Sequence, residues 1–293
     1  MLTNIRELIH HICHPGLVRE IVIENEDQLH KKPYLGIVIP TFNRPEYLKY
    51  TFHSLSISEL DTHQLVFLIF DDGSAEMTEQ LIRNVRWGNI PIIKIFSNRI
   101  NIVEQNEYTI LPGNAFPFTI RYGIEILFEL GATYVMNSDS DAMFASTWLY
   151  TITETLAKMK DHYFILSGFR CDDQFHKLVR EEEDYAILAS LGGINFTCNK
   201  NTFYDIVRPL IYDFSFDWLL SDVCNKKSIT IYVTIPSIVQ HIGVHSSIIR
   251  GANNQLAECY ECSQDNITLD KMRNLNESVK QLSDFPHADD IFW

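Results

Sequence analysis

The sequence predicts an α/β fold with a mostly parallel central sheet flanked by helices. In the first half of the chain, short apolar runs rich in Val, Ile, Leu and Phe alternate with stretches whose apolar residues recur at helical spacing. This alternation is typical of βαβ units, in which helices cover both faces of a parallel sheet. The second half is less regular. Because no linker separates the halves, we predict one continuous domain.

The first half contains four predicted strands. "YLGIVIP" (34–40) is followed by the helix "RPEYLKYTFHSLSI", in which Pro45 suits the first turn. "QLVFLIF" (64–70) is followed by the helix "AEMTEQLIRNVRW", and "PIIKIF" (91–96) is the third strand. The segment "FTIRYGIEILFELG" is predicted to be a helix that ends at Gly131, and "TYVMNS" is the fourth strand.

The remaining segments are assigned in the same way. We predict strands at "YFILSGF" (163–169) and "GGINFTCN" (192–199), and a strand with its exit at "ITIYVTIPSIVQHIG" (229–243). "NTFYDIVRPLI" is a predicted helix, and "FDWLLSDVCNK" starts another after its aspartate. Residues 1–33 are predicted to be an N-terminal helical extension, and residues 251–293 a polar C-terminal segment.

Composition narrows the functional classes. The formal net charge of −14 argues against a nucleic-acid-binding protein, because phosphate contacts need surface Lys and Arg. No apolar run approaches the roughly 20 residues of a transmembrane segment. The N-terminus also lacks the apolar core and cleavage site of a signal peptide. We therefore expect a cytoplasmic protein, with six cysteines that are mostly buried free thiols rather than disulfides.

Polar residues follow each predicted strand of the first half. "PTFNR" follows the first strand, "DDGS" the second, "SNR" the third and "NSDSD" the fourth. Each acidic motif alone is an ordinary turn former. However, the carboxyl ends of parallel strands meet at one edge of a sheet, where ligands bind in such folds. We therefore predict that both acidic motifs lie along the same edge and form a ligand site.

Three motifs carry a resemblance to a known family. "IVIPTFNRPEYLKYTFHSL", "FLIFDDGS" and "YVMNSDSDAMF", in that order, resemble the nucleotide-binding half of GT-A glycosyltransferases of the family 2 type. The resemblance extends loosely to about residue 247 through "GGINF", "FDW" and "VQHIGVHSS". It implies a Rossmann-like GT-A domain at 34–250, with a nucleotide-sugar-binding half at 34–145 and an irregular acceptor half at 146–250.

The implied activity is a metal-dependent, inverting transfer of a hexosyl or N-acetylhexosaminyl group to an acceptor hydroxyl. The implied donor is a nucleotide sugar, with a UDP-sugar as the leading candidate. The acceptor stays open between a glycan, a lipid-linked sugar and a protein. The pattern contains no transmembrane segment, which argues against a processive polysaccharide synthase.

The resemblance also implies roles for the acidic residues. Asp141 is expected to bind a divalent cation, Asp139 to contact the ribose or the metal shell, and His241 to complete the metal site. Oxygen ligands with one imidazole suit Mn²⁺ or Mg²⁺ rather than zinc. Asp72 is expected to accept a hydrogen bond from the nucleobase, while Asp71 builds the turn.

Further donor contacts are implied at seven positions, with Phe42 packing against the uracil. Arg121 matches the Arg of the family's Ala-Arg-Asn-x-Gly segment, but Tyr122 replaces the usual Asn, which puts donor contacts there in doubt. The implied donor-binding residues, besides Asp72 and Asp139, are Pro40, Thr41, Phe42, Asn43, Arg44, Arg121 and Ser140.

An inverting transferase needs a base that takes the proton of the acceptor hydroxyl. Asp217 in "SFDWLL" matches the acid that plays this role in the family, with Asp213 and Asp222 as reserves. The alternative for Asp217 is an N-cap, since Asp is a preferred residue before a helix.

Two other functions stay open. A nucleotidyltransferase could use the same sheet and metal, but it normally carries a Gly-rich basic loop after the first strand, and "PTFNRPEY" has no glycine. A non-catalytic relative could bind a nucleotide or a glycan without turnover. Against that reading, the chain holds Asp72, Asp139, Asp141, Asp217 and His241 together. The motifs of P-loop, zincin and α/β-hydrolase enzymes are not found.

Overall fold

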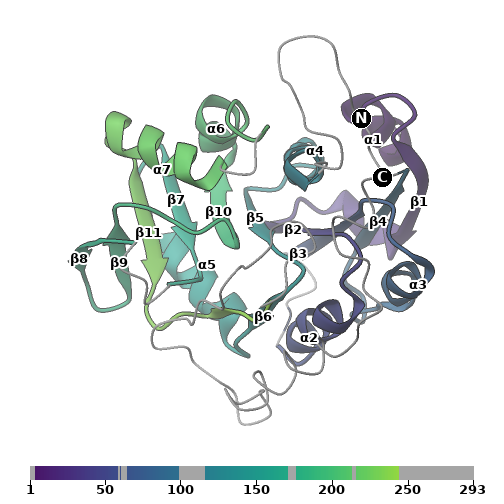
Figure 1. Ribbon diagram of the computed structural model, residues 1–293, viewed down its shortest axis with the longest axis horizontal. Helices are drawn as coiled ribbons and strands as arrows, with labels where there is room; N and C mark the ends of the chain where they lie inside the picture. Colours follow the sequence, from purple (N-terminus) through teal and green to yellow (C-terminus); the bar gives the residue numbers. More distant parts are fainter. Residues whose placement is uncertain are drawn as a thin grey trace, which may run out of the picture.

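The structure is a computed structural model that describes residues 4–58, 60, 65–98, 116–170, 176–212 and 216–243. Within these residues it contains a ten-stranded mixed sheet with the strand order β1-β4-β3-β2-β5-β10-β7-β11-β9-β8, and a two-stranded sheet of β12 and β6 (Figure 1). Helices flank the large sheet. The predicted α/β fold, with a central sheet flanked by helices, is confirmed.

Four parallel strands make up the part of the sheet that the first half builds. β4 (Ile92–Ser97), β3 (Leu65–Asp71), β2 (Leu35–Thr41) and β5 (Tyr134–Ser138) lie side by side in that order, and each neighbouring pair runs parallel. They match the four predicted strands to within one residue at each end. Nearly all of their side chains are buried, as expected where helices cover both faces.

The predicted helices of this half are confirmed as well. They are α2 (Pro45–Ser56), α3 (Glu76–Asn84) and α4 (Phe116–Glu129). Pro45 occupies the first turn of α2, where its missing N–H costs no hydrogen bond. After the C-terminal end of α4, Gly131 adopts a φ of 93°, the left-handed conformation that commonly ends a helix.

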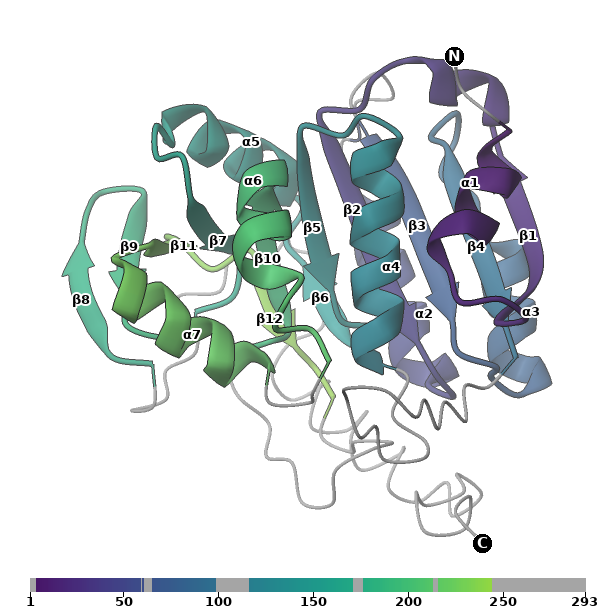
Figure 2. The ribbon, with the colours of Figure 1, turned by 90° about the horizontal axis from the view of Figure 1, so that it is seen from above.

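Helices lie on both faces of the large sheet. α4, α1 (Ile5–Ile12) and α7 (Phe216–Lys227) cover one face, and α2, α3 and α5 (Trp148–Lys158) cover the other (Figure 2). Each face has its own hydrophobic core. Successive side chains of β2 therefore point to different cores, because side chains alternate along a strand.

The packing of α4 on β2 is unusually close. A Cβ added to Gly123 would lie 2.5 Å from Cγ1 of Val38, and one added to Gly36 would lie 2.9 Å from Cδ1 of Leu127. These glycines let the two backbones approach. This close packing fixes the position of α4 on β2. It therefore also fixes Arg121, on α4, relative to Thr41 at the end of β2.

The second half continues the sheet with mixed strand directions. β10 runs antiparallel to both β5 and β7, while β11 runs parallel to β7. Beyond them, β8 and β9 form an antiparallel hairpin at the edge. The strands are β6 (Ala142–Phe144), β7 (Phe164–Ser167), β8 (Leu178–Glu181), β9 (Tyr185–Leu188), β10 (Asn195–Asn199), β11 (Thr230–Thr234) and β12 (Val239–His241).

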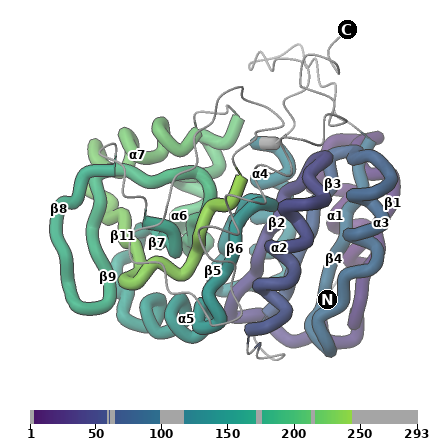
Figure 3. The backbone as a smooth tube through the Cα atoms, turned by 60° about the horizontal axis from the view of Figure 1, so that its bottom comes forward, coloured from purple at the N-terminus to yellow at the C-terminus, as the bar shows by residue number. Residues whose placement is uncertain are grey.

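The chain finally returns to the first half. β12 pairs with β6, which follows β5 directly, and Figure 3 shows this last described segment running back toward α2. The return brings His241 opposite Ala142, next to the "NSDSD" segment. The strand predicted at 229–243 is thus two strands, β11 and β12, with an Ile235–Pro236 cis peptide between them.

Two predictions need correction. Residues 1–33 are not simply a helical extension, since α1 is followed by β1 (Val18–Glu24) and a short 3₁₀ helix (Glu26–His30). β1 pairs antiparallel with β4 and so satisfies the backbone groups that this sheet edge would otherwise expose. The helix predicted in "NTFYDIVRPLI" is a short α6 (Lys200–Thr202) that continues as a π-helical turn (Phe203–Val207).

The remaining expectations concern cysteines and membranes. Cys13, Cys198 and Cys224 are buried and free, as predicted. Cys171, Cys259 and Cys262 lie outside the described residues, as does the predicted segment 251–293. Among the helices that the structure describes, none is both long and apolar enough to cross a membrane.

Candidate active site

The loops after β2 and β3 are bound to each other at the carboxyl edge of the sheet. Thr41 and Asp71 are aligned at the ends of these parallel strands, and the Asp72 N–H donates to the Thr41 carbonyl at 3.0 Å. Asp71 is fully buried, and its Oδ2 accepts the Ser74 N–H at 3.1 Å. Asp71 therefore builds the turn, as predicted, and burial raises its pKa to about 6.

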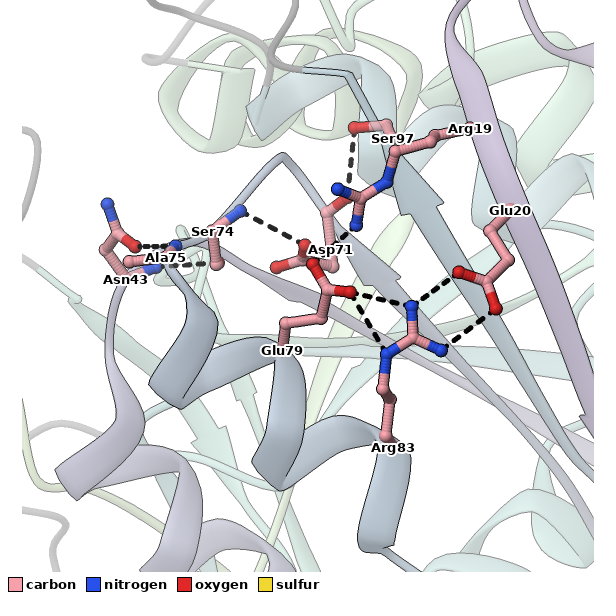
Figure 4. Close-up of polar contacts among 9 residues, drawn as sticks. All are labelled: Arg19, Glu20, Asn43, Asp71, Ser74, Ala75, Glu79, Arg83 and Ser97. Carbon is pink, nitrogen blue, oxygen red and sulfur yellow. Dashed lines mark hydrogen bonds and ion pairs between the residues drawn. The ribbon is translucent and has the colours of Figure 1, made fainter.

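Asn43 holds the two loops in register. Its N–H donates to Ser74 Oγ at 2.9 Å, and its Oδ1 accepts the Ala75 N–H at 2.7 Å (Figure 4). Its φ of 47° is left-handed, a conformation that Asn tolerates better than most residues. Through these contacts Asn43 links the loop after β2 to the loop after β3. Its implied contact with a donor stays a prediction.

Asp141, the second acid of the D-x-D motif, is almost completely buried. Its Oδ2 contacts Arg44 Nη1 at 2.6 Å and His241 Nε2 at 3.0 Å. Burial alone would raise the pKa of Asp141, but the positive charge of Arg44 and the His241 contact hold it below its usual range. The loop after β2 and strand β12 therefore both contact the Asp141 carboxylate of the D-x-D segment.

Gly243 makes this convergence possible. A Cβ at this position would lie 1.8 Å from Asp141 Oδ2 and 2.6 Å from Arg44 Nη2. The backbone is held there because the Ile242 N–H donates to the Asp141 carbonyl at 2.9 Å. Sequence analysis did not select Gly243, and its only signal was the position directly after "VQHI".

Asp139, the other acid of the motif, is in a different electrostatic setting. Burial and the charge of Asp141 raise its pKa well above the usual range. Its Oδ1 is buried and accepts no hydrogen bond, and the same holds for Oδ1 of Asp141. Between them, Ser140 is buried, and its carbonyl accepts the Thr51 hydroxyl at 2.8 Å. The D-x-D segment is thus rigidly held and has unused acceptor atoms.

Hydrogen bonds to one backbone segment, Gly193–Ile194, connect Asp217 to the D-x-D segment. The Asp139 N–H donates to the Ile194 carbonyl at 2.9 Å, and the neighbouring Gly193 N–H donates to Asp217 Oδ2 at 3.2 Å. The Trp218 N–H donates to Asp217 Oδ1 at 2.9 Å. The Gly193–Ile194 segment before β10 therefore links the acid of the second half to the acids of the first.

The N-cap alternative for Asp217 is not supported. α7 begins at Phe216, so Asp217 lies inside the first helical turn, and its side chain accepts from the next residue rather than from the second or third N–H beyond it. Burial raises the pKa of Asp217, while the N–H groups of Trp218 and Gly193 act in the opposite direction.

Of the two reserve bases, the structure describes only Asp222. Asp222 is exposed on α7 and forms an ion pair with Lys226 at 2.5 Å. Asp213 lies outside the described residues.

The other predicted donor contacts lie at the same edge of the sheet. Pro40 and Thr41 are the last residues of β2, and Thr41 Oγ1 is buried without a hydrogen-bond partner. Phe42 follows them and is half-buried. Arg121 is half-buried on α4, and its Nε also has no partner. Thr41 and Arg121 thus offer polar atoms that a ligand could satisfy.

The acids fit a divalent cation in chemistry. Unpartnered carboxylate oxygens of Asp139 and Asp141, with the His241 imidazole beside them, are ligand types that Mn²⁺ and Mg²⁺ accept. Within the described ranges, however, no three His, Cys, Asp or Glu side chains already form a ligand set. A cation would have to share Asp141 with Arg44, which sequence analysis had placed against the donor rather than against the acid.

The chain is similar to known proteins in structure and not in sequence. No family model matches the chain, and no curated protein does either. Among solved structures, the crystal structure of S. aureus TarS 1–349 is similar at 14% sequence identity and a TM-score of 0.43, with 68% of this chain and 60% of that chain covered. The chain therefore spans less than two thirds of that structure. At this level of similarity, the function has to be inferred from the site itself.

Proposed function

We propose that this protein is a GT-A glycosyltransferase that moves a sugar from a nucleotide-sugar donor to an acceptor hydroxyl with inversion. One observation carries the proposal. The backbone of Asp139, in the D-x-D segment after a parallel strand of the first half, is joined through Gly193–Ile194 to the carboxylate of Asp217 in the second half. A transferase has to bring a donor and an acceptor together, and this arrangement places acids suited to each at one junction.

The donor would bind along the carboxyl ends of β2, β3 and β5, where ligands of parallel sheets bind. Asp72 would accept a hydrogen bond from the imide N–H of a uracil, which makes a UDP-sugar the leading candidate. Arg44 and Arg121 would supply positive charge for the diphosphate. Their guanidinium groups suit phosphate oxygens because they can donate two parallel hydrogen bonds.

Asp141, with Asp139 and His241, would hold Mn²⁺ or Mg²⁺. When bound, such a cation would act as a Lewis acid that stabilises the charge of the leaving diphosphate. Arg44 contacts the same Asp141 oxygen as His241 does, so it would keep this buried carboxylate charged before a cation arrives. Gly243 would leave room for these contacts.

Asp217 would act as the general base. Two backbone N–H groups orient its carboxylate. A base is most effective when its pKa approaches the working pH, and burial shifts the pKa of Asp217 in that direction. It would take the proton of the acceptor hydroxyl while that oxygen attacks the sugar carbon from the face opposite the leaving diphosphate.

A nucleotidyltransferase is the second enzyme candidate, because it could use the same acids and cation. The loop after β2 disfavours it, since "PTFNRPEY" offers no glycine-rich phosphate cradle. A binding protein without turnover is the third candidate. It would have no need of a buried carboxylate with a raised pKa beside the acceptor side of the site.

One assay separates the three candidates. The protein is incubated with a panel of nucleotide sugars, with Mn²⁺ or with a chelator, and released nucleoside diphosphate is measured. Slow release of UDP with Mn²⁺ and none with chelator supports the transferase. Release of pyrophosphate from a nucleoside triphosphate and a sugar phosphate supports the nucleotidyltransferase. Ligand-induced thermal stabilisation without any turnover supports the binding protein. Asp222→Asn, which alters an exposed acid of α7, is the control variant.

A further inference from the structure

Trp218 is an exposed aromatic residue directly beside the proposed base. About half of it is accessible to solvent (49%), although most large apolar side chains in the described ranges are buried. On the same helix, Phe216, Leu220 and Cys224 point into the core, so Trp218 lies on the outer face of α7. A large apolar ring left at the surface beside a functional site is a recognised sign of a binding surface.

A second ring holds Trp218 in place. The His176 imidazole stacks on it with ring centroids 5.9 Å apart and an interplanar angle of 19°. His176 Nδ1 is in turn 2.8 Å from the hydroxyl of Ser190, which is buried. The two nearly parallel rings therefore restrain each other, and the exposed part of this stacked pair is here called the Trp218–His176 platform.

The platform lies next to the proposed base at both of its rings. The Trp218 backbone N–H donates to Asp217 Oδ1, and a Cβ added to Gly192 would lie 3.7 Å from His176 Nε2. Gly193, the next residue, donates to the other oxygen of Asp217. A molecule that rests on the platform thus lies beside the group that would deprotonate it.

We propose that the Trp218–His176 platform binds a pyranose ring of the acceptor, so that the acceptor class is a saccharide. This proposal rests on the glycosyltransferase function proposed above. One face of a pyranose carries axial C–H groups and stacks on a rigid aromatic ring, while its hydroxyls stay available to polar partners. Asp217 is such a partner at the edge of the platform.

The surroundings favour a saccharide over a lipid tail. A long acyl chain needs a continuous apolar surface. On α7, the exposed residues one and two turns after Trp218 are Asp222 and Asn225, both polar, while the apolar Leu219 and Val223 beside this face are partly buried. A single aromatic surface with hydrogen-bonding groups around it is typical of a site that orients one polar ring.

Intrinsic tryptophan fluorescence gives a direct test without a donor. Trp87 and Trp148 are buried, and Trp293, which lies outside the described residues, is replaced by Phe in every variant, so a saccharide on Trp218 should change the emission of an exposed indole selectively. Binding is measured on an immobilised array of oligosaccharides and then by fluorescence titration with the best binders. The variants are Trp218→Ala and Trp218→Phe, with Tyr150→Ala as the control, since Tyr150 is an exposed ring on α5 (69% accessible).

The proposal predicts that the wild type binds saccharides, that Trp218→Ala weakens binding about tenfold or more, and that Trp218→Phe keeps part of it. Tyr150→Ala should match the wild type. The Tyr150→Ala control should also keep the wild-type UDP affinity and donor hydrolysis. The proposal is overturned if no saccharide on the array binds, or if Trp218→Ala binds as well as the wild type. Trp218-dependent saccharide binding without any donor turnover would instead reject the glycosyltransferase function and leave the platform standing.

Discussion

The two halves of the molecule differ in regularity, and the difference follows a division of chemical tasks. In the first half, parallel strands β2, β3 and β5 each end at the same edge in a polar loop. In the second half, parallel and antiparallel strands alternate, and one segment returns to the first half as β12. A regular edge suits the constant part of a substrate, such as a nucleotide diphosphate. An irregular half can vary with the acceptor.

The acids on the two sides of the junction differ in the same way. Asp141 is held in its charged form by Arg44 and His241, which suits a group that would bind a cation. Burial makes Asp217 harder to ionise, and the N–H groups of Trp218 and Gly193 and the charge of His176 offset this effect only in part. A raised pKa makes the Asp217 carboxylate a more effective proton acceptor. The central claim is therefore that the first half binds the donor and the second half activates the acceptor.

The largest effect is expected for Asp141→Asn. A cation contributes several kcal/mol to stabilising a transition state, so losing its carboxylate ligand should lower Mn²⁺-dependent turnover at least about 10²-fold. The fold has to be checked in this variant, because Arg44 and His241 lose the carboxylate that they contact. Initial rates and thermal melting are measured together, with Asp222→Asn as control. Near-wild-type turnover would remove Asp141 from the metal site.

Gly243→Ala tests the convergence on Asp141 without removing any charge. The added methyl would lie 1.8 Å from Asp141 Oδ2, so the carboxylate and Arg44 must separate. We expect a fall in donor hydrolysis of about 10-fold to 10²-fold, because misplacing catalytic groups by about 1 Å costs rates of this order. Gly192→Ala is the matched control, since its methyl would meet no atom closer than 3.7 Å. Equal rates in both variants would show that the approach of β12 to Asp141 has no part in the reaction.

Asp72→Ala addresses donor binding alone. A hydrogen bond between a base and a carboxylate contributes about 1.5–3 kcal/mol, so the donor KM should rise about tenfold or more. The contact is remote from the reacting carbon and is shared by ground and transition states, so kcat should change much less. Calorimetry with UDP checks the same point, and an unchanged affinity would exclude the contact.

The last predicted effect concerns stability rather than rate. Burial raises the pKa of Asp71 from 3.8 to about 6, so ionisation is harder in the folded state than in the unfolded chain. This contribution to stability is complete below pH 4 and is lost as the pH rises to about 6 and beyond. Asp71→Asn cannot ionise, so between pH 4 and pH 7 its stability should gain about 2–3 kcal/mol relative to the wild type. Urea unfolding across this range measures the difference, and parallel pH profiles would contradict it.

The sequence predicted the first half well because its signals are local. β2, β3, β4 and β5 are apolar runs with clear polar ends, and the direction of parallel strands implies that their ends meet. β1 was missed because its burial is only partial, so "VREIVIE" mixes charged and apolar residues as an exposed helix does. β8 was missed for a related reason, since all four of its residues are exposed.

The site shows the same limit. Asp139, Asp141 and Asp217 could be selected by their place in motifs. The ion pair between Arg44 and Asp141 could not, since it joins residues 97 positions apart whose approach depends on the packing of β2 against β5. The role of Gly243 was also invisible, because it depends on which atoms a missing Cβ would meet, and the role of Gly193 depends on where its backbone N–H points.

The central claim is tested most directly by comparing transfer with donor hydrolysis in Asp217→Asn. The comparison uses the saccharide acceptor that gives the fastest transfer with the wild type, and Asp222→Asn as the control on the same helix. A general base contributes about 10²–10⁴-fold, so transfer should fall by that factor, while UDP affinity and slow donor hydrolysis stay near the wild-type values. If transfer and hydrolysis fall together, or if transfer is unchanged at equal melting temperature, the two halves do not divide the reaction between donor and acceptor.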